Sequence, residues 1–173
     1  MNRSDTDASQ FLKDLENVLR MQIDGYARLL VALGRKREVI KLAQLDRVGG
    51  IAEIELKILE RLHELDQRRE AVIVDVIKAL GIEGQEASVS TICGALPEEA
   101  AARLLALASE LRKNIEQARK ESSVVRSAGE ALSNHMAGVM QSVRGVLASA
   151  GIYGNQGQLT TGVARASGLD VSS

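Results

Sequence analysis

The stretch that decides the fold is residues 104–150, LLALASE LRKNIEQ ARKESSV VRSAGEA LSNHMAG VMQSVRG VLASA, written in groups of seven. Apolar or small residues recur in it at alternating steps of three and four. A rhythm kept over several heptads is typical of one face of a long helix that packs on other helices. The positions are Leu104, Ala108, Leu111, Ile115, Ala118, Ser122, Val125, Gly129, Leu132, Met136, Val139, Val143, Val146 and Ala150.

Two earlier segments, residues 9–43 and 51–80, show the same rhythm. Gly49 and Gly50 between them predict a turn near residues 44–50, so the two helices form a hairpin. Residues 82–96 lose the rhythm and form a connector with room for one short helical turn at residues 89–93. Pro97, followed by two glutamates, then predicts the start of a third helix.

The third helix is predicted over residues 97–150, either unbroken or divided near Gly129, where serine and glycine weaken it. The fold class is therefore all-α. We expect an antiparallel bundle of long coiled-coil-like helices, three in number, or four if the third is broken. It forms a single domain over residues 1–150. The glycine-rich tail, residues 151–173, buries too little apolar surface to order and is predicted to be disordered.

Composition and charge exclude several classes of function. Aromatic residues make up 2% of the chain, which suits helix-on-helix seams and removes the stacking platforms of single-stranded nucleic-acid binders. With 22 basic and 23 acidic residues, no net field attracts phosphate backbones or anionic lipids. The longest apolar runs are far shorter than the roughly 20 residues that span a bilayer. We therefore expect no nucleic-acid partner and no membrane insertion.

The cysteine content and the N-terminus predict the compartment. Cys93 is the only cysteine, so an intramolecular disulfide is impossible and a reducing compartment is expected. The first ten residues are polar and lack the apolar core of a signal peptide. These two features predict a cytoplasmic protein.

No motif supports catalysis, a metal or a cofactor. His63 begins a near-match to the zinc-protease helix signature, but Gln67 stands where the second histidine ligand is needed. Cys93 lies in a connector of low charge and is interpreted as a small buried hydrophobe. The glycine pair at Gly154 and Gly157 lacks the strand-to-helix setting of a nucleotide site. We therefore expect a protein that is not an enzyme.

Three surface features remain as candidates. The basic cluster of Arg35, Lys36, Arg37 and Lys41 is interpreted as a solvated helix face. His135 could be exposed on a helical bundle, the setting of a histidine phosphotransfer module, although no lysine follows it. The apolar face from Leu132 onward is either the bundle's own seam or an exchangeable helix that captures a partner's helix. Its residues are Leu132, Met136, Val139, Met140, Val143, Val146 and Leu147.

The order of these elements resembles the FlgN family of flagellar type III export chaperones. The resemblance rests on the long first helix, the IELKILE and DQRR patterns of the second, the connector that ends in ALPEE, the third helix, and the tail with YGNQG. It covers roughly residues 10–160. The resemblance implies a cytosolic helical chaperone that holds hook-associated proteins of the hook–filament junction unassembled and delivers them to the flagellar export gate.

The same resemblance implies where the partners bind. Client binding in the family falls on the C-terminal helix region, here residues 132–147, and Tyr153 is the candidate for docking at the export gate. The alternatives are a histidine phosphotransfer module that uses His135 and a generic coiled-coil adaptor. A homo-oligomer is compatible with the apolar seam.

Overall fold

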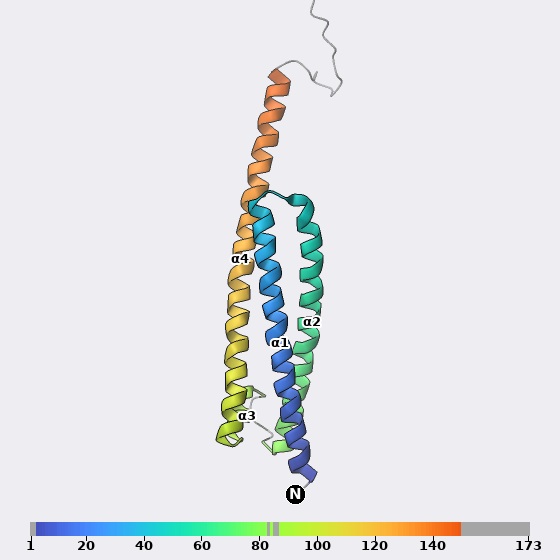
Figure 1. Ribbon diagram of the computed structural model, residues 1–173, viewed down its shortest axis with the longest axis vertical. Helices are drawn as coiled ribbons and strands as arrows, with labels where there is room; N and C mark the ends of the chain where they lie inside the picture. Colours follow the sequence, from blue (N-terminus) through green and yellow to red (C-terminus); the bar gives the residue numbers. More distant parts are fainter. Residues whose placement is uncertain (1–2, 83, 85–86, 150–173) are drawn as a thin grey trace, which may run out of the picture. The chain divides into compact units, whose positions relative to one another are not determined.

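The computed structural model describes residues 3–82, 84 and 87–149. Four helices account for nearly all of them: α1 (Arg3–Lys41), α2 (Leu45–Leu80), α3 (Val89–Gly94) and α4 (Glu98–Ser149) (Figure 1). No strand occurs within the described residues, so the predicted all-α class is confirmed. The described residues divide into two compact units, one that ends at Gly129 and one that begins at Glu130. The first holds α1, α2, α3 and the first part of α4.

The first unit is built on an antiparallel hairpin of α1 and α2 (Figure 1). The helices approach closely at Gly25, where an added Cβ would lie 2.7 Å from Cδ2 of Leu62. Gly25 therefore costs α1 some helix propensity but leaves room for the Leu62 side chain of α2. The predicted hairpin is thus present.

The predicted position of the turn is wrong. The turn occupies residues 42–44, where Ala43 adopts a left-handed φ of 52° and Gln44 N–H donates to the Val39 carbonyl at 2.9 Å. Gly49 and Gly50 lie inside the first turns of α2 and are exposed. The glycine pair favours a break in the chain, but an exposed glycine costs a helix only about 1 kcal/mol, and α2 continues through both. The chain already reverses direction at residues 42–44, before it reaches Gly49.

The core of the first unit draws on all four helices. Leu15 and Leu19 of α1 form one cluster with Val76 of α2, Ile92 of α3 and Leu104 of α4, and each of these side chains is almost fully buried. The short helix α3 is capped by Ser88, whose hydroxyl oxygen accepts a hydrogen bond from the Thr91 backbone N–H at 3.2 Å. The predicted short turn at residues 89–93 is therefore confirmed, and it delivers Ile92 to the core.

Polar pairs cross the interfaces between the helices. Lys36 Nζ lies 2.7 Å from Glu55 Oε2 and joins α1 to α2, while Arg37 Nη1 lies 2.8 Å from Glu121 Oε1 and joins α1 to α4. Gln22 is 2% exposed and donates to Asp66 Oδ1 at 3.4 Å. Polar groups on a helical seam fix its register, because a slipped pairing would leave them buried without partners.

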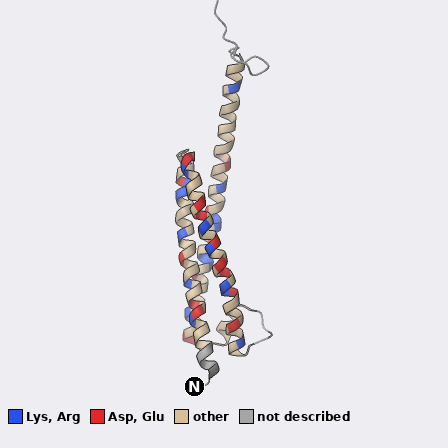
Figure 2. Ribbon diagram, turned by 90° about the vertical axis from the view of Figure 1, so that its right-hand side faces the viewer, with Lys and Arg blue, Asp and Glu red and all other residues tan. Residues whose placement is uncertain are grey.

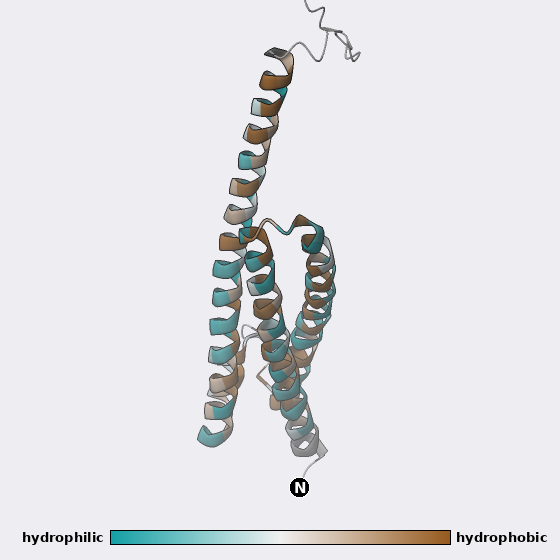
Figure 3. Cartoon of the chain, turned by 45° about the horizontal axis from the view of Figure 1, so that its top comes forward, coloured by the Kyte–Doolittle hydropathy of each residue, from teal (hydrophilic) through white to brown (hydrophobic). Residues whose placement is uncertain are grey.

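The third predicted helix is a single unbroken helix, α4. Pro97 precedes it directly, and the Pro97 carbonyl accepts from the Ala101 N–H at 3.0 Å. Within the first unit its core-facing residues recur every seven positions: Leu104, Leu111, Ala118 and Val125 are all buried. Hydrophobic residues continue along the C-terminal part of α4 (Figure 3). No helix in the described ranges is both long and apolar enough to cross a bilayer.

The packing of α4 predicts a sharp difference between two leucines of the same helix. Leu111 is 3% exposed and Leu105 is 48% exposed. Leu111→Ala should lower the free energy of unfolding by about 2–5 kcal/mol, because it leaves a cavity in the core. Leu105→Ala is the matched control and should change it by less than about 1 kcal/mol. Chemical denaturation of both variants measures the difference, and equal losses would contradict the packing of α4.

Candidate helix-binding surface

The heptad pattern of α4 runs through the whole helix, but its apolar side chains are fully buried only up to Val125. Leu104, Leu111, Ala118 and Val125 are buried in the first unit. Val139, two heptads beyond Val125, is 49% exposed. The second apolar position of each heptad is also exposed in this part of α4, as Met136 with 45% exposure shows. The same sequence pattern therefore serves as a core seam up to residue 129 and as an open apolar face after it.

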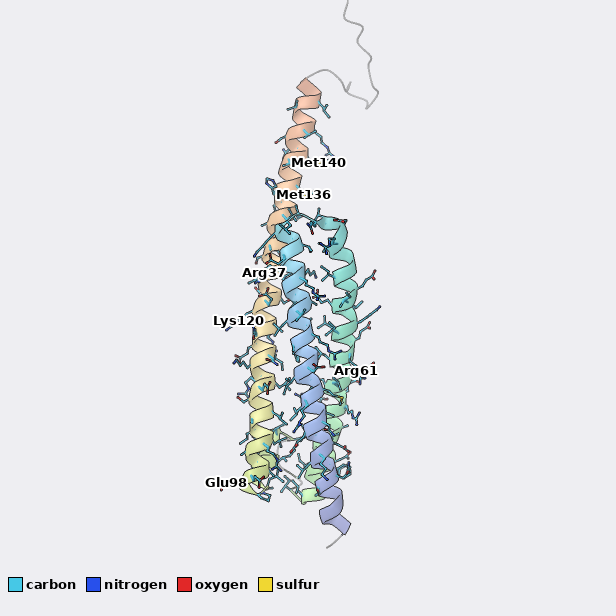
Figure 4. The ribbon with its side chains drawn as sticks, viewed as in Figure 1. Arg37, Arg61, Glu98, Lys120, Met136 and Met140 are labelled. Atoms are coloured by element: carbon cyan, nitrogen blue, oxygen red, sulfur yellow. The ribbon has the colours of Figure 1, made fainter. Side chains whose placement is uncertain are left out.

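We call this open face the exposed seam. With 3.6 residues per turn, its side chains fall in a sector about 120° wide on one side of the helix. Met136 and Met140 lie on it in Figure 4, and both are about half exposed. Val143 is 47% exposed, while Leu132 and Leu147 are half-buried. Its members are Leu132, Met136, Val139, Met140, Val143, Val146 and Leu147.

Charge is sparse on this part of α4. No Asp, Glu, Lys or Arg occurs between Glu130 and Arg144. Figure 2 shows charged residues along the helices of the first unit and few along the C-terminal part of α4. The face opposite the exposed seam carries small or neutral polar residues, such as Asn134 and Gln141, both exposed. An apolar stripe on a helix of low charge is suited to burial against another helix.

This part of α4 is also intrinsically weak as a helix. Gly138 and Gly145 each cost about 1 kcal/mol relative to alanine. The Ser142 hydroxyl donates to the Gly138 carbonyl at 3.0 Å, a back-bond that often bends a helix. The thioethers of Met136 and Met140 add side-chain flexibility. Together these features give an apolar surface that can adapt its shape.

The other candidates from the sequence do not form a site. His135 is exposed on α4 and forms no hydrogen bond or ion pair with any described residue. His63 Nε2 lies 3.1 Å from Gln67 Nε2 on an exposed face. No group of three His, Cys, Asp or Glu side chains in the described ranges is arranged to hold a metal ion. Tyr153 lies outside the described residues.

Cys93 is half-buried in α3. Its thiol faces the Ala101 carbonyl with an Sγ-to-oxygen distance of 3.8 Å, and burial raises the pKa of this thiol. A raised pKa reduces the thiolate fraction at neutral pH, so the thiol is a poor nucleophile. Cys93 packs against the core cluster, in agreement with its interpretation as a small hydrophobe.

The basic cluster of α1 is structural rather than a simple solvated face. Lys36 and Arg37 are half-buried and pair with α2 and α4, as described above. Lys41 pairs with Glu38 at 3.0 Å, and this contact lowers the pKa of the Glu38 carboxyl. Arg35 is exposed. The pairings of Lys36 and Arg37 could not be predicted from the sequence, because their partner acids lie on other helices.

The described structure is thus that of an all-α coiled-coil-like protein that carries an uncovered apolar helix face. A comparison with known families adds the identity: the model of the FlgN protein family matches residues 11–161. The chain belongs to the FlgN family, which is a family of flagellar export chaperones. No curated protein and no solved structure matches the chain.

Proposed function

We propose that this protein is a cytoplasmic chaperone that keeps hook-associated proteins of the flagellum unassembled and delivers them to the flagellar export gate. Membership of the FlgN family supports an export chaperone in general. The observation that carries the finer proposal is the exposed seam, where heptad-spaced apolar side chains such as Met136 and Val143 remain open to solvent. Proteins that polymerise through terminal helices need those helices covered before export.

The proposed binding mode is a client helix packed along the exposed seam. A client's apolar stripe would interdigitate with the α4 heptads as one helix does with another in a coiled coil. Fully burying a side chain such as valine or methionine is worth about 1.5–3 kcal/mol. Several such side chains can therefore hold a client without any charged contact.

Release is the second requirement of an export chaperone. Gly138 and Gly145 lower the stability of the helix that carries the exposed seam. Ordering this helix on a client then consumes part of the binding energy, which favours moderate affinity and faster dissociation. Docking at the gate is assigned to Tyr153, on the family resemblance alone, and gives the chaperone a contact separate from its client surface.

The first prediction concerns the exposed seam. Met136→Asp combined with Val143→Asp places two charges on the apolar face. We expect affinity for a purified hook-associated protein to fall at least about tenfold, a loss of about 1.4 kcal/mol or more. Asn134→Asp combined with Gln141→Asp is the matched control, with the same charge change on the opposite face, and should bind within about twofold of the wild type. Isothermal titration calorimetry measures both, and equal affinities for the two double variants would refute the assignment.

The second prediction concerns export. Tyr153→Ala should leave the client affinity within about twofold of the wild type, because it lies outside residues 132–147. It should reduce secretion of the client into the culture medium, measured by immunoblot in cells that express the variant at wild-type levels. A parallel loss of client binding and secretion would show that Tyr153 belongs to the client surface instead.

A further inference from the structure

A second apolar surface lies within the first unit, in a groove between α2 and α4. Two adjoining hollows of about 440 and 800 Å³ form it, and both are lined by Ile115 and Arg119 of α4. The groove extends along α4 from Leu105 to Arg126. Helix α1 contributes apolar side chains to its lining and α2 contributes part of one wall. Its deepest apolar side chains, Leu19, Leu29, Leu33 and Ile73, already belong to the core, and its more exposed ones are Leu59, Leu105 and Ile115.

The two flanks of α4 differ in how their charges are used. On the flank toward α1, Glu121 pairs with Arg37 at 2.8 Å and Arg103 with Glu16 at 3.7 Å. On the flank toward the groove α4 carries one acid, Glu116, and three arginines spaced by seven residues. Because seven residues make nearly two helical turns, these arginines form one row along the groove. They are Arg112, Arg119 and Arg126.

No acidic side chain in the described part of the chain forms an ion pair with this arginine row. Two acids line the groove, and only one of them has no other partner among the described residues. Glu55, in the groove wall, pairs with Lys36 at 2.7 Å. Arg69 of α2 also lines the groove, and its own charge is matched by Asp66 at 2.8 Å. Glu116 is the one remaining acid among the groove residues, so the groove carries a net positive charge above an apolar floor.

We propose that this groove binds an amphipathic helix of a partner protein that carries acidic side chains at seven-residue spacing beside its apolar stripe. The apolar stripe would cover Leu59, Leu105 and Ile115, which are exposed or half-buried, and the acids would pair with the arginine row. Arg112 and Arg126 are about 21 Å apart along the helix axis, so three acids over two heptads match the row. The bound helix would pack with α1, α2 and α4 as a four-helix bundle. The charges beside the apolar stripe would select the partner, as they do in coiled coils.

The occupant is a different protein rather than this chain. Residues 130–149 contain a single acid, Glu130, and the tail at residues 150–173 contains one, Asp170. Neither segment can supply a row of acids at heptad spacing. Asp46, Glu53 and Glu60 of α2 do have this spacing, but the apolar stripe of α2 that contains Leu62 and Leu65 is already buried. Leu62 packs at Gly25 of α1, so α2 of a second copy could not place that stripe in the groove. This second surface is separate from the exposed seam and does not depend on the role proposed for it.

The test uses the full chain and a designed, fluorescein-labelled 21-residue helical peptide. The peptide has leucine at the two core positions of each heptad and glutamate at one flanking position. Fluorescence anisotropy measures its affinity for the wild type and for three double variants. These are Arg112→Glu with Arg119→Glu, Lys113→Glu with Lys120→Glu, and Met136→Asp with Val143→Asp. The lysine pair is the matched control: it makes the same charge change on the same helix, and neither lysine lines the groove. Figure 4 shows Lys120 on the edge of α4 away from α1.

We expect the double arginine substitution to lower the affinity for the peptide at least tenfold. The double lysine substitution should change this affinity less than threefold. A second peptide with lysine in place of glutamate should bind the arginine-to-glutamate variant at least tenfold more tightly than the wild type. This gain also shows that the variant is folded. The proposal would be overturned if the peptide did not bind the wild type, or if the arginine and lysine variants lost equal affinity for it. It would also be overturned if only the Met136→Asp and Val143→Asp variant lost affinity. Self-association of the wild type that the arginine pair abolishes would assign the groove to a second copy and overturn it too.

Discussion

The seven-residue repeat of α4 determines which side chains of this helix reach the core. It supplies Leu104, Leu111, Ala118 and Val125 to the core of the first unit. The repeat continues without a change of phase to Val139 and Val146, which are exposed. A helix with one apolar face must bury it to be stable in water. The first part of α4 does so within its own chain, and we propose that the second part does so on a client.

Polar contacts give the bundle its specificity. Aliphatic seams alone permit neighbouring registers of similar energy, because their contacts are not directional. Gln22 with Asp66 and Lys36 with Glu55 fix α1 against α2, and Arg37 with Glu121 fixes α1 against α4. No Asp, Glu, Lys or Arg occurs between residues 131 and 143, so no charged side chain there can mark a register. A surface without fixed polar partners suits a chaperone that must accept and release a helix.

Periodicity in the sequence was enough to predict the all-α fold, the hairpin, the short α3 and the approximate extent of α4. It did not place the turn between α1 and α2. Gly49 and Gly50 are a strong local signal that the helix tolerates, and Ala43 turns the chain with no local signal at all. The distant ion pairs of Lys36 and Arg37 were also missed, because a single sequence does not show which residues of different helices meet. The exposed seam was among the sequence candidates, but only the structure shows that Met136, Val139 and Val143 are open to solvent.

We propose that the continuous helix α4 packs in the core up to residue 129 and binds a client after it. Hydrogen exchange along α4 can be measured by mass spectrometry with and without a purified hook-associated protein. We expect strong protection of amides near Leu111 and Ala118 in the free protein and weak protection of residues 132–147. We also expect the client to slow exchange at residues 132–147. Strong protection of that segment in the free protein, or protection unchanged by the client, would show that it is not a client-binding surface.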